Sequence, residues 1–74
     1  MGRKQVQRDV GEPLMLTYKE AARKLNVSLS KLYKLLREGE IRSLKLGPQE
    51  RRIPMGEVRA YVDRLVAEQI GEAP

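Results

Sequence analysis

The hydrophobic pattern between Leu16 and Pro54 changes its period within 39 residues, which limits the folds open to this chain. Apolar residues first recur every three to four positions, as on a helix, in two short segments joined by a few residues. From Ile41 they alternate with polar residues, as on a strand, and Pro54 suits the first turn of a new helix. The order predicts two short helices, a β-hairpin and a third helix.

A capping box opens the first predicted helix. The Thr17 hydroxyl can accept a hydrogen bond from the backbone N–H of Glu20, while the Glu20 side chain reaches back to the Thr17 N–H. An apolar face follows at helical spacing: Tyr18, Ala21, Ala22 and Leu25. Asn26 is suited to a left-handed termination, and Ser28 is the N-cap candidate of the next helix.

The second predicted helix, about residues 29–38, has one apolar and one polar face on a helical wheel. The apolar face consists of Leu29, Leu32, Leu35 and Leu36. The opposite face carries a hydroxyl and cations: Ser30, Lys34 and Arg37, flanked by Lys31. Tyr33 lies at the margin, and Gly39 supplies the stop. Leu29 is open to two interpretations, a core residue or an exposed apolar contact with a ligand.

The predicted hairpin places Leu44 and Leu46 on one side of its first strand and Lys45 on the other. Residues 47–50 are turn material, and residues 51–53 form the return strand. Because adjacent arginines on a strand point to opposite faces, we expect only one of the pair Arg51-Arg52 to reach a ligand that lies against one face of the hairpin.

The third predicted helix carries an apolar stripe, which we expect to close over the first two helices: Val58, Tyr61, Val62, Leu65 and Val66. We expect residues 1–13 to be a flexible N-terminal tail, with Arg3, Lys4 and Arg8 available for loose phosphate contacts or without a role. Residues 14–69 are the predicted domain, and residues 70–74 are a C-terminal tail.

The net charge of +5 is unevenly distributed. Residues 14–53 carry ten basic and four acidic side chains, a net of +6, whereas residues 54–74 carry two basic and four acidic side chains, a net of −2. Residues 1–13, with three basic and two acidic side chains, add +1. Positive charge concentrated in the helix–helix–hairpin segment favours a phosphate-binding surface over a merely solvated one.

The composition argues against several classes of function. With no Cys and no His, the chain lacks thiolate ligands, imidazole ligands and the commonest general base. We therefore expect no metal, no cofactor and no enzymatic activity. The carboxylates of the last helix, Glu57, Asp63, Glu68 and Glu72, are interpreted as a solvated face. Nothing resembles a signal peptide or membrane span, so we expect a cytoplasmic location, in a bacterium or a phage-infected host cell.

The residues, taken in order, resemble the excisionase family (recombination directionality factors), small MerR-like winged-helix DNA-binding domains. The resemblance covers about residues 16–66 and rests on Leu16-Thr17, Glu20-Ala21-Ala22, Leu25 to Ser28, Leu32 to Leu36, Gly39-Glu40-Ile41, Lys45-Leu46-Gly47 and Arg51 to Pro54. It implies a mostly α fold with a small β-hairpin, a winged helix-turn-helix of three helices and a two-stranded wing in the order α-α-β-β-α. It also implies a recognition helix in the major groove and a wing against the neighbouring minor groove or backbone.

The sequence departs from the family at the wing tip, where Gln49 and Glu50 stand in place of a basic residue. A carboxylate there would repel phosphate. We therefore expect the tip to face away from the DNA while Lys45, Arg51 and Arg52 make the contacts.

The candidate DNA-binding residues of the recognition helix divide by position. Ser30, Lys31 and Lys34 lie in the part of the helix that helix-turn-helix docking directs at bases, and Arg37 lies further along, towards phosphate. Tyr33 has two possible roles: its ring fills the edge of the core, or its hydroxyl contacts a phosphate. Ser28 leaves a helix N-terminus whose amides can hold a phosphate.

The resemblance implies an accessory factor that binds repeated sites on double-stranded DNA cooperatively, bends the DNA and directs an integrase towards excision. Its expected partners are DNA, a cognate integrase and neighbouring copies of itself, with no membrane and no small-molecule effector. The alternative is a small MerR-like transcriptional regulator using the same domain. A third hypothesis, from another class, is a protein–protein adaptor whose basic face binds an acidic partner.

Overall fold

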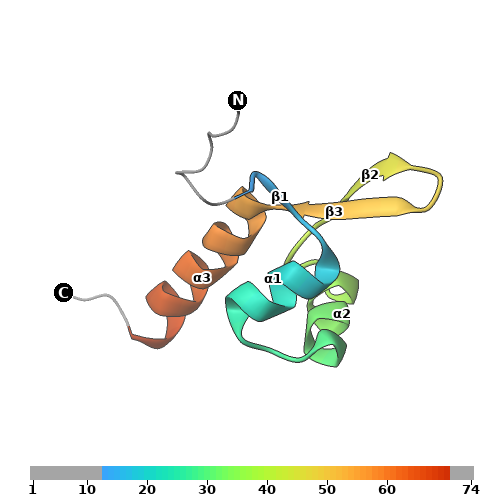
Figure 1. Ribbon diagram of the computed structural model, residues 1–74. Coiled ribbons are helices and arrows are strands. Elements are labelled where there is room, and N and C mark those ends of the chain that lie inside the picture. The colour runs from blue at the N-terminus through green and yellow to red at the C-terminus, as the bar shows by residue number, and fades with distance from the viewer. Residues whose placement is uncertain (1–12, 71–74) are drawn as a thin grey trace.

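The computed structural model describes residues 13–70, in which three helices pack on one side of a small antiparallel sheet and a hairpin projects away from them (Figure 1). The elements are β1 (Met15–Leu16), α1 (Tyr18–Leu25), α2 (Leu29–Arg37), β2 (Leu44–Gly47), β3 (Glu50–Pro54) and α3 (Met55–Gln69). The predicted winged helix-turn-helix is confirmed. The tail residues Arg3, Lys4 and Arg8 and the carboxylate Glu72 lie outside the described residues. Within residues 13–70, no helix combines the length and apolar character that crossing a membrane requires.

Local side-chain chemistry sets the ends of α1 and α2. The backbone N–H of Glu20 donates to Thr17 Oγ1 at 3.1 Å, and the Thr17 N–H donates to Glu20 Oε1 at 2.9 Å. Asn26 ends α1 in the left-handed region, with φ of 59°. The Ser28 hydroxyl then caps α2 by accepting from the Lys31 N–H at 3.1 Å. The capping box, the terminator and the second cap predicted from the sequence are all confirmed.

The sheet contains a short strand that the sequence pattern did not predict. The strand order is β1-β3-β2, and Leu16 and Met15 pair with Ile53 and Pro54 of β3. A strand of two residues is too short to show alternation, so the sequence carries no signal for it. Because β3 is the central strand, one of its edges pairs with β2 in the wing and the other pairs with β1. This second pairing anchors the wing to the body of the domain.

The first strand of the wing begins later than predicted. Alternation was expected from Ile41, but β2 starts at Leu44. Ile41 is fully buried, and the backbone N–H of the next residue, Arg42, donates to Glu57 Oε1 at 2.9 Å. Ile41 therefore packs into the core and does not pair on the sheet.

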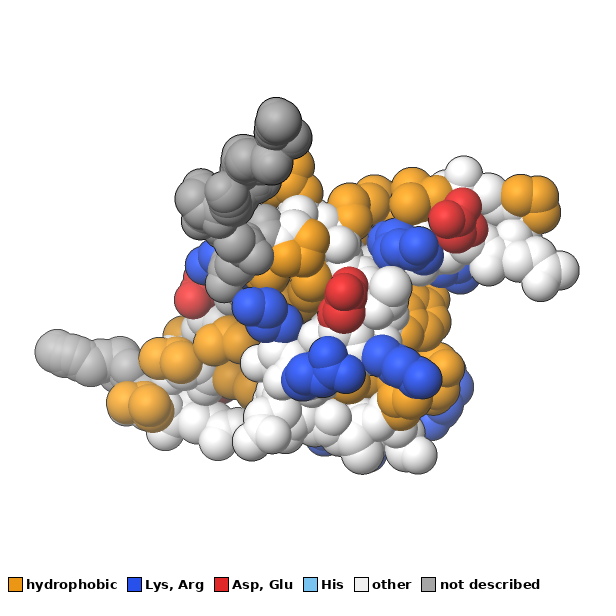
Figure 2. All heavy atoms as spheres, viewed as in Figure 1, with side chains coloured by type: hydrophobic (Ala, Val, Ile, Leu, Met, Phe, Trp, Pro, Cys, Tyr) orange, Lys and Arg blue, Asp and Glu red, His pale blue; other side chains and the backbone are white. Residues whose placement is uncertain are grey.

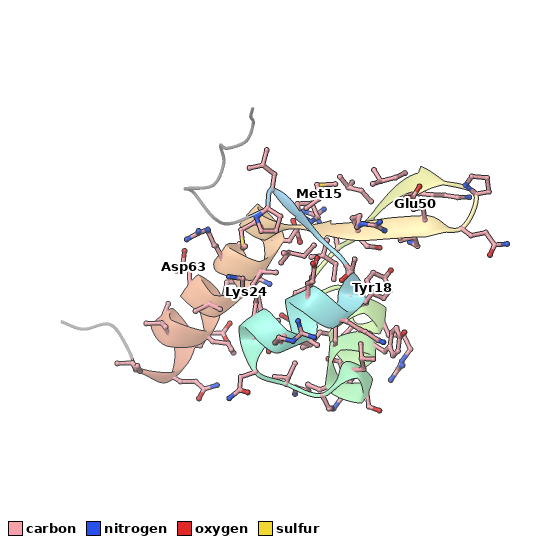
Figure 3. All side chains as sticks on the ribbon, in the orientation of Figure 1. Met15, Tyr18, Lys24, Glu50 and Asp63 are labelled. Atoms are coloured by element: carbon pink, nitrogen blue, oxygen red, sulfur yellow. The ribbon has the colours of Figure 1, made fainter. Side chains whose placement is uncertain are left out.

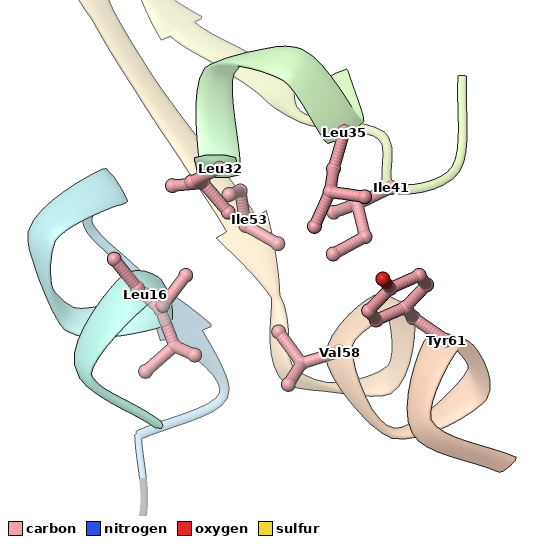
Figure 4. Packing of buried hydrophobic residues seen from close by; sticks show 9 residues of the cluster. Leu16, Leu32, Leu35, Ile41, Ile53, Val58 and Tyr61 are labelled. Atoms are coloured by element: carbon pink, nitrogen blue, oxygen red, sulfur yellow. The ribbon is translucent and has the colours of Figure 1, made fainter. Parts of the chain in front are cut away.

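Every helix and strand except β2 contributes to one core (Figure 4). The largest fully buried side chains are Leu16, Leu32, Ile41 and Ile53, joined by Leu35, Val58, Tyr61 and the two alanines of α1. Tyr61 of α3 points towards Ile41 in the close-up view.

The apolar stripe predicted on the third helix is only partly correct. Val58 and Tyr61 are buried and Leu65 is partly buried, but Val62 and Val66 are 40% and 46% exposed. The helix packs against β3 and α1. Its C-terminal half extends beyond this contact (Figure 1), so the stripe continues onto an uncovered surface.

Candidate nucleic-acid interface

The outer face of α2 presents the residues that the helical wheel placed there. Leu32 and Leu35 are buried, and the candidate base-reading and phosphate-binding residues on the other side are all exposed: Ser30, Lys31, Lys34 and Arg37. Lys34 Nζ lies 4.0 Å from a carboxylate oxygen of Glu38, one turn further on, and both side chains are about half exposed. A pair of this kind contributes little free energy, so the Lys34 ammonium can exchange it for another acceptor.

Ser28 and Leu29, at the start of α2, have structural roles. The Ser28 hydroxyl is occupied in capping, so a phosphate at this end would meet backbone amides. Leu29 is half-buried and packs against the core, which favours the first of its two interpretations.

A chain of four side chains links α2 to the wing through α1. The Tyr33 ring, 48% exposed, meets the Tyr18 ring edge-to-face with centroids 5.8 Å apart. The Tyr18 hydroxyl donates to Ser43 Oγ at 3.2 Å, and Arg51 Nε donates to the same oxygen at 3.1 Å. Tyr18 lies where α1, α2 and the base of the hairpin meet (Figure 3). The guanidinium of Arg51 is thus held in a fixed relation to α2.

The wing has two unlike faces, which follow from its register. Lys45 pairs with Arg51, so these cations share a face with Ile53, two residues along β3, and Ile53 is buried against the helices. Leu44 pairs with Arg52 on the opposite face. Lys45 and Arg51 therefore lie on the helix side of the sheet.

Arg52 is engaged within the hairpin. Its Nη1 donates to the Arg51 carbonyl at 2.9 Å, and its Nη2 lies 3.4 Å from Glu50 Oε2. Glu50 lies on the outer part of the hairpin (Figure 3), and this ion pair partly compensates the charge that was expected from the sequence to repel phosphate.

Two ion pairs join α3 to the segment between α2 and β2. Arg42 Nη2 lies 3.5 Å from Glu57 Oε2, and Arg64 Nη2 lies 3.6 Å from Glu40 Oε1 and also donates to the Glu40 carbonyl. Glu57 was interpreted as a solvated carboxylate, but it also accepts the Arg42 backbone N–H. These contacts, which the sequence pattern did not indicate, connect α3 to the segment through which the chain leaves α2 for the wing.

Cationic and hydrophobic side chains lie on different parts of the surface. Figure 2 shows Lys and Arg side chains gathered over α1 and α2 and again on the hairpin, whereas hydrophobic side chains cover much of the visible end of α3. Across residues 13–70, no three His, Cys, Asp or Glu side chains are grouped as a metal site would require.

Two short helices joined by a tight turn, with an exposed cationic face on the second and a basic hairpin beside it, define a winged helix-turn-helix DNA-binding domain. The family model described as "Helix-turn-helix domain" matches residues 15–65, and the chain belongs to this family. It is 41% identical over 56 residues to a protein of Saccharopolyspora erythraea described as "Probable excisionase". The match covers 76% of the chain and 56% of that relative. The resemblance seen in the sequence is thereby confirmed, and the chain spans just over half the length of the relative.

Proposed function

We propose that the chain is an excisionase-type accessory factor that acts by binding DNA and carries out no catalysis. It binds repeated sites cooperatively in the cytoplasm of a bacterial or phage-infected cell, bends the DNA and directs a cognate integrase towards excision. The observation that carries the proposal is the fixed pairing of α2 with Arg51 through Tyr33, Tyr18 and Ser43. A recognition helix and a cationic wing in a fixed relation can follow two adjacent grooves at once.

We assign roles to the site residues that this placement supports. Ser30, Lys31 and Lys34 read base edges in the major groove, with Arg37 and the exposed edge of Tyr33 on the flanking backbone. The amides behind Ser28 bind a phosphate, and Lys45 and Arg51 grip the backbone beside the neighbouring minor groove. Arg52 stabilises the hairpin through its two contacts with it.

Cooperative binding is supported by the small size of the base-reading surface. One nine-residue helix offers few base contacts, so several copies in tandem would provide the affinity that one lacks. The uncovered end of α3 and its C-cap residue Ile70 form the candidate contact with a neighbouring copy or the integrase, because Val62, Val66 and Ile70 are exposed four residues apart.

Footprinting on the DNA flanking the gene tests the function directly. We expect several protected sites that fill over a narrow range of protein concentration, next to a recombination attachment site. Protection confined to a promoter would instead favour the transcriptional regulator. Absence of protection, together with binding to an acidic protein, would favour the adaptor and contradict the proposal.

Because Lys45 and Arg51 lie on one face of the wing, removing both tests whether that face contacts the DNA backbone. The double variant Lys45→Ala, Arg51→Ala should weaken binding to cognate and random duplexes about equally, because interactions with the DNA backbone carry no sequence information. The slope of log affinity against log salt should flatten by about 0.9 for each phosphate that the variant no longer neutralises. Fluorescence anisotropy titrations at several salt concentrations measure both quantities.

Arg52→Ala is the matched control for this experiment, since it removes a neighbouring cation of the same strand from the opposite face. We expect its salt dependence to remain that of the parent chain. A flattening as large as that caused by Arg51→Ala alone would show that the wing meets the DNA with its other face.

A further inference from the structure

The outer end of the wing carries apolar side chains that binding to phosphate does not explain. Leu46 is 53% exposed, and Pro48 is exposed in the turn that follows it. Figure 2 shows hydrophobic side chains along one edge of the projecting hairpin and at its far end. Single exposed apolar side chains are common on protein surfaces, but contiguous ones mark contact sites, and Leu46 and Pro48 lie two residues apart at the projecting end.

The strand is irregular at the same point. Lys45 pairs with Arg51 and Gly47 pairs with Glu50, so two steps along β2 oppose one step along β3. Leu46 is the extra residue of this β-bulge and has no cross-strand partner. A bulge redirects the side chain of its extra residue and increases the local twist of the strand. The side chain of Leu46 therefore does not follow the regular alternation of β2.

The same end of the wing carries little uncompensated charge. Gly47, Pro48 and Gln49 are uncharged, and the Glu50 carboxylate is paired with Arg52 at 3.4 Å. The cations Lys45 and Arg51 lie nearer the body of the domain. A wing held to the backbone by these two cations would therefore bring an apolar, nearly neutral end towards the bases. This differs from the outward-facing tip expected from the sequence, because that expectation treated the Glu50 carboxylate as unpaired.

The dimensions of the wing suit a groove that has been opened. The four residues of β2 span about 13 Å at roughly 3.3 Å per residue, which exceeds the minor-groove depth of about 7.5 Å. Two paired strands are too wide, however, for a regular minor groove of about 6 Å. Kinking the duplex towards the major groove, where α2 would lie, relieves this misfit.

We propose that Leu46 and Pro48 form an apolar wedge that enters the minor groove beside the α2 site and partly unstacks one base step. Apolar side chains inserted in this way kink DNA by about 20–90°. The inference rests on the proposed function and adds that one bound copy bends the DNA by itself. Pyrimidine–purine steps deform most easily, so the wedge would also select such a step at a position that no hydrogen bond reads.

The test compares the parent chain with the double variant Leu46→Ala, Pro48→Ala on an end-labelled duplex that carries a single footprinted site. Fluorescence energy transfer between the ends reports the bend, and permanganate reactivity reports unstacked thymines. We expect the bend to fall by at least about 20°, the lower end of the range for apolar wedges, and the permanganate signal to disappear. The salt dependence of binding should not change, because both substitutions leave every cation in place.

Leu44→Ala and Ile70→Ala are the matched controls. Leu44 is an exposed leucine of the same strand nearer the body, and Ile70 is an exposed apolar residue at the end of α3. Both variants should bend the duplex as the parent does. Circular dichroism confirms that each variant is folded.

Two results would overturn the wedge. One is a double variant that bends and unstacks the duplex as the parent does, which rejects the wedge and leaves DNA binding in place. The other is an equal loss of bending in Leu44→Ala, which would assign the effect to the hairpin as a whole. A parent chain without salt-dependent DNA binding would instead reject the proposed function, and the wedge with it.

Discussion

Leu32→Ala is expected to destabilise the domain by about 2–5 kcal/mol, the usual result of truncating a fully buried leucine. Leu32 has no exposed surface and lies beside Ile53, where α2 meets the central strand (Figure 4). At about 0.05–0.15 kcal/mol per residue, a chain of 74 residues has a free energy of unfolding of roughly 4–11 kcal/mol. We therefore expect the variant to lose a large share of its stability and to unfold at a clearly lower temperature and urea concentration than the parent, as measured by thermal and urea denaturation followed by circular dichroism.

Leu44→Ala is the control, because Leu44 is 49% exposed on the outer face of the wing. Its effect on the free energy of unfolding should stay within about 0.5 kcal/mol, as for other surface substitutions. If the Leu32 variant unfolded at the same urea concentration as the parent, the placement of α2 on the core would be wrong.

Lys34→Ala is expected to weaken binding to the cognate site by about 1–3 kcal/mol, or roughly 5- to 150-fold, and to weaken binding to random duplex much less. Lys34 lies in the middle of the exposed face of α2, and its ion pair with Glu38 is a weak surface interaction at 4.0 Å. Competition titrations with the footprinted site and a scrambled duplex of equal length measure the ratio of the two affinities.

Arg37→Ala is the matched variant, one turn further along the same face. It should weaken binding to both duplexes alike, because it is assigned to the backbone. Equal losses of affinity for Lys34→Ala would reassign Lys34 to the backbone as well, and base reading would then rest on Ser30 and Lys31.

The features predicted correctly from the sequence depend on neighbouring residues. The capping box at Thr17, the left-handed Asn26 and the two-faced pattern of α2 each involve positions at most a few residues apart. Their physical causes are hydrogen bonds to the nearest backbone groups and helical periodicity, and both can be read in one dimension.

The features that the sequence pattern did not reveal depend on contacts between distant segments. Strand β1 exists only because β3 lies beside it, and Ile41 is buried because Tyr61 and Leu35 surround that part of the core. Which of Arg51 and Arg52 lies on the helix side of the sheet depends on the register of the hairpin. The contact of Arg51 with Ser43 joins residues eight positions apart in the sequence. Similarly, Val62 and Val66 share the helical period of buried residues, and only the extent of the surface packed against α3 separates the two groups.

The central claim is that α2 and the wing form one phosphate-binding surface, and the salt dependence of binding to duplex DNA tests it most directly. Neutralising several phosphates makes the logarithm of the affinity fall linearly with the logarithm of the salt concentration, at about 0.9 per phosphate. With α2, its N-terminus and the wing all in contact, we expect the affinity to fall steeply between about 50 and 200 mM salt. An affinity that stayed level over this range would contradict the claim.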